Sequence, residues 1–222
     1  MQKSMAKLKR FPFSRLTIKE ASIRATLMYN PYPPRTVPKV RWSIGIQTHP
    51  MELKEATIDP DLETVVDSPI TLEQLDLDIA SWHDLAGTFA LSVDSQDGTF
   101  CVSTAHNPVH VEKLIMTSEG GTRFNVDATM RFYFELEGTG FRDEVIRLSF
   151  PAKYEGFTFC VPDWSEPSKA KCPARWGVPS NKPEWTDKQL LGFVQRYIDL
   201  SQYERPKIKS HKYLSAIPKT NA

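Results

Sequence analysis

The sequence has few of the features that mark secreted or membrane-spanning proteins. Its 222 residues include three cysteines, Cys101, Cys160 and Cys172, and no N-x-[ST] glycosylation acceptor. An odd number of cysteines without paired spacing argues against a disulfide framework. No segment approaches the run of about eighteen apolar residues that a transmembrane helix needs. These absences predict a soluble protein of the reducing cytoplasm, with no transmembrane segment.

Motifs of the common enzyme classes are missing as well. The chain has no Walker-type phosphate loop and no G-x-S-x-G nucleophile elbow. Gly138-Thr139-Gly140 follows an expected strand, but no helix is predicted after it, so the dinucleotide-binding fingerprint is incomplete. We therefore expect a binding protein rather than an enzyme, with no catalytic residue, no metal and no cofactor.

Charge, by contrast, is strongly sorted along the chain. Residues 1–41 carry ten Lys/Arg against the single acid Glu20, a net charge of +9. Residues 42–100 carry twelve acids against the single base Lys54, a net charge of −11. Residues 101–222 add +3, and the formal total of +1 hides this separation. Because a patch of one sign attracts a partner of the opposite sign, the pattern predicts a charged binding surface.

The length and composition fit one domain with basic extensions. We expect a basic N-terminal leader over residues 1–20, a single domain over 21–204 and a basic tail over 205–222. Within the domain, residues 162–185 are rich in proline and tryptophan and are expected to form a long loop. The leader lacks the apolar stretch of a secretory signal, but its basic, acid-poor composition leaves a mitochondrial-type presequence as an alternative.

Alternation of apolar and polar residues with period two predicts a sheet. In Val40–Gln47, for example, every second side chain is a large apolar one. A capping box of Thr17 and Glu20 leaves a helix as the alternative for the first strand. Turns are expected at Asp97-Gly98 and Gly120-Gly121, and we expect a sheet of about seven or eight strands, drawn from nine alternating runs. The predicted strands are Ala21–Met28, Val40–Gln47, Thr88–Asp94, Thr99–Ser103, Val111–Thr117, Thr122–Ala128, Met130–Glu137, Glu144–Phe150 and Tyr154–Val161.

Two segments carry helical signals. Thr71–Ile79 begins with a Thr71/Gln74 capping box and has apolar residues at helical spacing. Thr186–Tyr203 begins with a Thr186/Gln189 box and carries a longer apolar stripe. The predicted fold class is therefore α+β: a mostly antiparallel β-meander sheet packed by a C-terminal amphipathic helix.

Histidine and cysteine supply the only candidates for chemistry. His106 and His110 have the spacing of two zinc ligands on one helical turn, but Pro108 between them disfavours a helix. On an extended strand the two side chains would be about 13 Å apart, which is too far for one metal ion. We expect Asn107-Pro108 to form a turn. Cys172, in the Pro-rich loop, is the one thiol expected to be exposed, whereas Cys101 and Cys160 fall in half-buried strands.

The middle of the chain resembles the organisation of some bacterial toxin-immunity proteins. The resemblance is carried by Ser81-Trp82-His83-Asp84-Leu85-Ala86-Gly87-Thr88-Phe89 and by His106-Asn107-Pro108-Val109, and it covers roughly residues 80–204. It implies a sheet that opens with W-x-x-L-x-G, an H-N-P-V turn and a closing helix. It also implies no catalytic residues, since such proteins act by covering the active site of a cognate toxin.

The leading hypothesis is a cytoplasmic inhibitor that neutralises a partner protein, such as a toxin with a basic cleft, through the acidic segment of residues 52–84. Charge complementarity would steer the two proteins together. One alternative is an adaptor that binds nucleic acid or an anionic surface through the basic termini. Another is a hydrolase-like enzyme that uses His106, His110 or Cys172. The residues expected to contact the partner are Glu63, Asp67, Glu73, Asp76, Asp78, Trp82, Asp84, Trp164 and Trp176.

Overall fold

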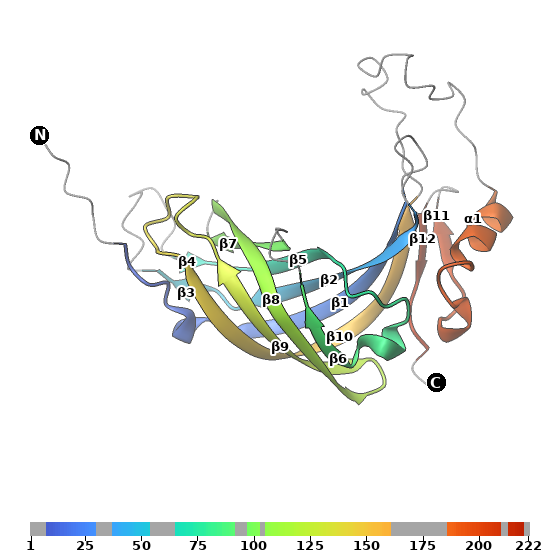
Figure 1. The fold of residues 1–222 in the computed structure, drawn as a ribbon, viewed down its shortest axis with the longest axis horizontal. Coiled ribbons are helices and arrows are strands. Elements are labelled where there is room, and N and C mark those ends of the chain that lie inside the picture. The colour runs from blue at the N-terminus through green and yellow to red at the C-terminus, as the bar shows by residue number, and fades with distance from the viewer. Residues whose placement is uncertain are drawn as a thin grey trace, which may run out of the picture.

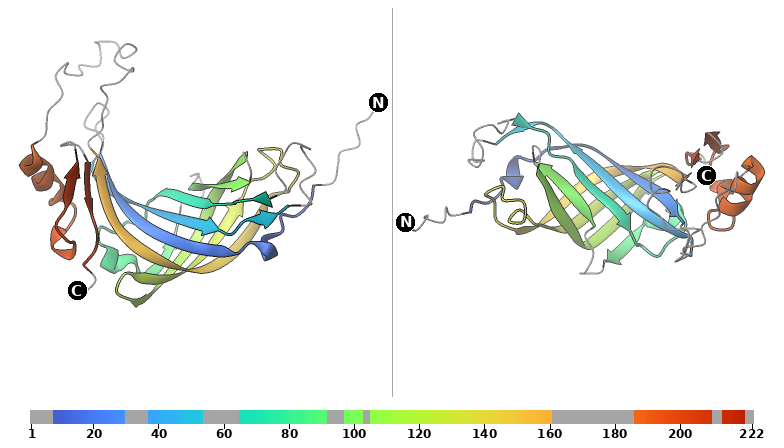
Figure 2. Two further views of the ribbon diagram at one scale, coloured as in Figure 1. Left: turned by 180° about the vertical axis from the view of Figure 1, so that it is seen from behind. Right: turned by 90° about the horizontal axis from the view of Figure 1, so that it is seen from above.

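The computed structural model describes residues 8–29, 37–53, 65–91, 97–102, 105–160, 186–209 and 213–219. Long curved strands dominate it, and the N-terminal and C-terminal segments lie at opposite ends of the sheet (Figures 1 and 2). The main sheet has ten strands: β1 (Ile18–Met28), β2 (Lys39–Thr48), β5 (Ile70–Leu75), β6 (Gly87–Ala90), β7 (Gly98–Val102), β8 (Ala105–Gly120), β9 (Arg123–Phe132), β10 (Glu144–Cys160), β11 (Lys207–Lys209) and β12 (Tyr213–Ala216). Strands β3 (Met51–Glu52) and β4 (Val65–Val66) form a separate small sheet.

The main sheet closes on itself. Its order runs β1-β2-β5-β7-β8-β9-β10, and β10 then pairs with β1. That closing pair is parallel, whereas the neighbouring pairs are antiparallel, as the sequence predicted for most of the sheet. Inward-facing side chains of all seven strands therefore meet in one apolar core.

Period-two alternation locates the buried face of the strands correctly. In β2, Val40, Trp42, Ile44 and Ile46 are all buried and the residues between them are more exposed. Ala21–Met28 is a strand as predicted, within β1, and the helix suggested by Thr17 and Glu20 does not form. A strand with an apolar side chain at every second position fits a sheet with one face against the core.

Two pairs of predicted strands are in fact single strands. All but the first residue of Thr122–Ala128 and the first three residues of Met130–Glu137 lie in the continuous strand β9, whereas residues 133–137 lie beyond its end and are not strand. Glu144–Phe150 and Tyr154–Val161 lie largely in β10. The inward positions keep the same parity across each predicted break, so nothing interrupts the ladder. In β9 these are Phe124, Val126, Ala128, Met130 and Phe132.

The helix predicted over Thr71–Ile79 is wrong, because the first part of this segment is β5. Between β5 and β2, Leu72 lies opposite Ile44 but Leu75 lies opposite Trp42, so three steps on β5 match two on β2. Gln74, with φ of 55°, makes this irregularity. The bulge puts Leu72 and Leu75 on the same face at a spacing of three, which imitates a helical stripe.

The turn predicted at Asn107-Pro108 is also wrong, since both residues lie within β8. Pro108 is opposite Thr99 of β7, and its carbonyl accepts a hydrogen bond from the Tyr133 amide, just beyond the end of β9. The β8–β9 pairing starts only at Val109 and Phe132. The proline nitrogen therefore faces the end of this ladder, where a missing N–H costs little.

The C-terminal helix begins as predicted and ends earlier. Helix α1 (Asp187–Val194) has Thr186 as its N-cap, with both hydrogen bonds of the capping box to Gln189. It buries Leu190 and Val194, and a short 3-10 helix follows at Leu200–Gln202. Strand β12 then pairs with β10, so part of the predicted basic tail belongs to the sheet. No helix within the described ranges is long and apolar enough to span a membrane.

The N-terminal segment packs against the sheet as well. A 3-10 turn at Phe13–Arg15 precedes β1, and Phe11 is buried with 3% of its surface exposed. The Lys9 amide donates to the Gly140 carbonyl at 2.9 Å, and the Arg142 amide donates to the Lys9 carbonyl at 2.9 Å. These backbone bonds hold the segment in place, and they bring the Phe11 and Phe13 rings into an aromatic cluster with Phe100, Phe132, Phe134 and Phe141.

Candidate functional site

Most described carboxylates of the acidic segment 52–84 are on the surface. Asp67, Glu73, Asp78 and Asp84 are all exposed, and none forms an ion pair with another residue in the described ranges. Glu73 lies in β5, and Asp84 lies in the 3-10 helix Trp82–Leu85 that precedes β6. The segment thus presents negative charge from positions that the sheet and the short helix fix.

Asp76 differs from these four because cations of the basic N-terminal region neutralise it. Lys39 Nζ lies 2.6 Å from its Oδ2, and Arg41 contacts the same oxygen. Although partial burial raises the pKa of Asp76, the hydrogen bonds from Lys39 and Arg41 outweigh it and leave this pKa below its ordinary value. Asp76 therefore ties the start of β2 to the end of β5 and is a poor candidate for partner binding.

Two further cations of the N-terminal region, Arg10 and Arg24, pair with carboxylates outside the acidic segment. Arg10 Nε donates to Glu144 Oε1 at 3.1 Å, and Arg24 Nη2 lies 2.6 Å from Glu155 Oε2. Both acceptors are on β10. Within the described part of the chain, positive charge near the N-terminus thus cancels Asp76 and forms no ion pair with Asp67, Glu73, Asp78 or Asp84.

Of the three tryptophans expected to contact the partner, Trp82 is the one that the structure describes. Trp82 is only 3% exposed, and its ring stacks against that of Tyr154 with centroids 5.6 Å apart. It belongs to the core and offers no surface to a partner, because the W-x-x-L segment turns both Trp82 and Leu85 inward. Glu63, Trp164 and Trp176 lie outside the described residues.

His106 and His110 do not act together. Both lie on β8, where His106 is exposed and His110 is buried. The extended strand separates them, in place of the turn that was predicted between them. Among the described residues no group of three or more His, Cys, Asp or Glu side chains is placed to hold a metal ion.

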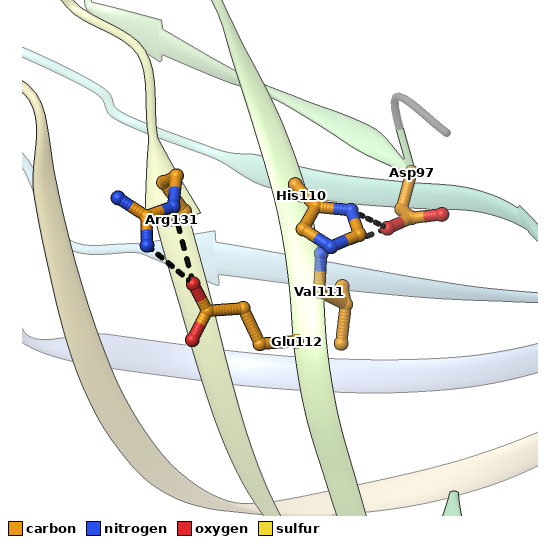
Figure 3. A network of polar contacts seen from close by, with 5 residues as sticks. All are labelled: Asp97, His110, Val111, Glu112 and Arg131. Atoms are coloured by element: carbon orange, nitrogen blue, oxygen red, sulfur yellow. Dashed lines mark hydrogen bonds and ion pairs between the residues drawn. The ribbon is translucent and has the colours of Figure 1, made fainter. Parts of the chain in front are cut away.

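His110 instead belongs to a buried junction between two strands. The sequence predicted a turn at Asp97-Gly98 between Thr88–Asp94 and Thr99–Ser103, but β6 and β7 both pair with the same strand, β8. Asp97 lies just before β7 (Figure 3). Its Oδ2 accepts the Val111 amide at 2.8 Å and lies 2.7 Å from His110 Nδ1. The Asp97 carboxylate therefore accepts the hydrogen bond of the Val111 amide in place of the backbone carbonyl that a continuous neighbouring strand would provide.

A second polar contact flanks this junction. Glu112 is the extra residue of a bulge in β8, between the pairs Val111–Met130 and Lys113–Thr129. Arg131 of β9 donates to Glu112 Oε1 from Nε at 3.1 Å and from Nη2 at 2.8 Å (Figure 3). The two contacts fix the middle of β8 from both sides, which marks the junction as structural.

Replacing Asp97 by alanine should lower the free energy of unfolding by about 2 kcal/mol, because the buried Val111 amide loses its acceptor. Asp97→Asn keeps an oxygen at this position and should cost less. Urea denaturation measures the stability, and hydrogen exchange at the Val111 amide reports the local effect. Wild-type stability and exchange in Asp97→Ala would show that the carboxylate does not support the ladder.

One contact was missed at the level of sequence. Cys101 of β7 and His106 of β8 are direct cross-strand partners, and Cys101 Sγ lies 3.6 Å from His106 Nδ1. Burial raises the pKa of the Cys101 thiol, which disfavours the reactive thiolate. A tight hairpin centred on residues 103–104 would place Cys101 opposite His106, so the spacing C-x4-H could have indicated the pair. We instead expected the turn at Asn107-Pro108, which would not bring these two residues together. Cys172 lies outside the described residues.

Comparisons of the chain with protein-family models, with curated proteins and with solved structures gave no match.

Proposed function

We propose that this protein is an inhibitor that binds a partner protein with a basic surface through the acidic segment 52–84. The observation that carries the proposal is the set of four exposed carboxylates, Asp67, Glu73, Asp78 and Asp84, which have no ion-pair partner among the described residues. Exposed like charges on a fixed scaffold attract a basic partner and accelerate its association. The resemblance to toxin-immunity proteins supports the inhibitory part of the proposal.

The alternatives have less support. Four cations of the basic N-terminal region, Arg10, Arg24, Lys39 and Arg41, are already paired with carboxylates, which reduces the charge available to nucleic-acid phosphates. For the hydrolase alternative, the strand keeps His106 and His110 apart, and Cys172 lies outside the described residues.

Charge reversal on the acidic segment tests the proposal. Glu73→Lys, Asp78→Lys and Asp84→Lys in one variant should slow association with the partner by about 10- to 100-fold at low ionic strength, with a small effect on dissociation. The measurement is biolayer interferometry with the product of the adjacent gene, which is where the partner of an immunity-type inhibitor is expected.

A matched control reverses three exposed acids elsewhere, Glu119, Glu137 and Glu204, so that the net charge changes equally. The proposal requires the control to bind like the wild type. An equal slowing of association in both variants would show that net charge alone causes the effect. Unchanged binding by the first variant would show that these carboxylates are not part of the interface.

A further inference from the structure

The outer face of the β7–β8 hairpin carries a thiol and an imidazole side by side. Cys101 and His106 are opposite each other in the register, between the pairs Phe100–Asn107 and Val102–Ala105. Their neighbours Phe100, Val102 and Asn107 are buried, so Cys101 and His106 project to the other side of the sheet. His106 is exposed and Cys101 is half-buried.

The separation of the two atoms fits a tetrahedral metal ion. With Zn–S of about 2.3 Å and Zn–N of about 2.05 Å, two ligands at the tetrahedral angle are about 3.6 Å apart. The distance from Cys101 Sγ to His106 Nδ1 is 3.6 Å. A linear two-coordinate ion with the same bond lengths would need about 4.35 Å. The distance between the two donor atoms therefore matches the one that tetrahedral Zn²⁺ requires.

The chemistry of the donors agrees with the distance. Thiolate and imidazole are the ligands that zinc prefers in proteins. Because β7 and β8 are paired, the backbones of Cys101 and His106 are already held in place, and metal binding needs to order little more than the two side chains. The described residues provide no third protein ligand at this place, and the exposed side of the imidazole leaves room for solvent.

We propose that Cys101 and His106 bind one Zn²⁺ through Sγ and Nδ1, with water in the remaining positions. The imidazole binds as the neutral tautomer with its proton on Nε2. The thiol loses its proton to solvent as the Zn–S bond forms, so each bound ion releases one proton. The two ligands are not among the carboxylates of the acidic segment, although β7 pairs with β5 and the Cys101 amide donates to the Pro69 carbonyl at 3.0 Å. Zinc binding is measured without the partner protein, so its test is independent of the proposed inhibitory function.

The experiment uses the full chain with Cys160→Ser and Cys172→Ser, which leaves Cys101 as the one thiol. Co²⁺ is added as a spectroscopic probe and should produce a thiolate-to-metal charge-transfer band. Zn²⁺ should remove the band by competition, and calorimetry should give one Zn²⁺ per chain. Adding Cys101→Ser or His106→Asn should abolish the band and weaken Zn²⁺ binding by at least about 10- to 100-fold, the effect known for outer-shell ligand partners.

Circular dichroism controls for folding, which both outward-facing substitutions should preserve. Several results would overturn the proposal: no charge-transfer band in the parent, or equal Zn²⁺ affinity in either single variant. One Zn²⁺ per two chains, with a zinc-dependent dimer in sedimentation, would instead show that a second copy fills the positions we assign to water.

Discussion

Phe11→Ala should lower the free energy of unfolding by about 3–5 kcal/mol, the range for truncating a buried phenylalanine. The Phe11 ring lies 5.1 Å from that of Phe100, 5.3 Å from Phe134 and 5.2 Å from Phe141, measured between centroids. The N-terminal segment is thus a part of the core although the sequence marks it as a leader. Denaturant unfolding measures the loss.

Leu8→Ala is the matched control for Phe11→Ala. Leu8 lies in the same segment but has 43% of its surface exposed, so its truncation should change stability by less than about 0.5 kcal/mol. A near-neutral Phe11→Ala would mean that the segment can leave the aromatic cluster at little cost.

Gly156→Ala should destabilise the protein by at least about 3 kcal/mol, through backbone strain and a steric clash together. Gly156 has φ of 129°, and an added Cβ would collide with the carbonyl oxygen of Ala216 on β12. Either β12 moves away from β10 or the strand pair distorts. Denaturant unfolding gives the energy, and hydrogen exchange of the β12 amides tests the detachment.

Gly120→Ala separates the two causes. Gly120 has φ of 100°, but nothing lies within 4 Å of its added Cβ. It should show the conformational cost alone, about 1 kcal/mol. If Gly156→Ala lowers the free energy of unfolding no more than Gly120→Ala does, the clash with β12 is relieved at no cost in stability. The close approach of β12 to Gly156 would then not be needed for a stable fold.

The sheet-forming segments could be predicted because their signal is local. Alternation in β2 and β9 identifies both the strands and their inward side chains, since successive residues on a strand point to opposite faces. The start of α1 was equally clear, because Thr186 and Gln189 complete a capping box within one turn.

Signals failed where a distant neighbour changed their meaning. Thr71 and Gln74 look like a helix start, but pairing with β2 makes the segment a bulged strand. Asp97-Gly98 looks like a turn, yet the Asp97 carboxylate accepts a hydrogen bond from the Val111 amide of β8. Glycine is required at position 98 because an added Cβ would collide with the Thr71 carbonyl of β5. In both cases the decisive contact is with a strand that lies far away in the sequence, so the local pattern carries no information about it.

The candidate sites divide in the same way. The concentration of carboxylates in residues 52–84 is a property of the sequence, and their exposure at Glu73, Asp78 and Asp84 agrees with it. The burial of Trp82 and the pairing of Asp76 with Lys39 were not foreseeable, because each depends on a partner from another strand.

By itself, then, the sequence determined most of the extended segments, which of their faces are apolar, where α1 starts and where charge accumulates. Each of these follows from neighbours within a few residues. The tertiary structure alone decided that β10 closes the sheet against β1, that Phe11 joins the core and that Cys101 meets His106. Such contacts join residues as far apart as Arg24 and Glu155, 131 positions along the chain. Strand pairing and register select them, and local periodicity carries no information about either.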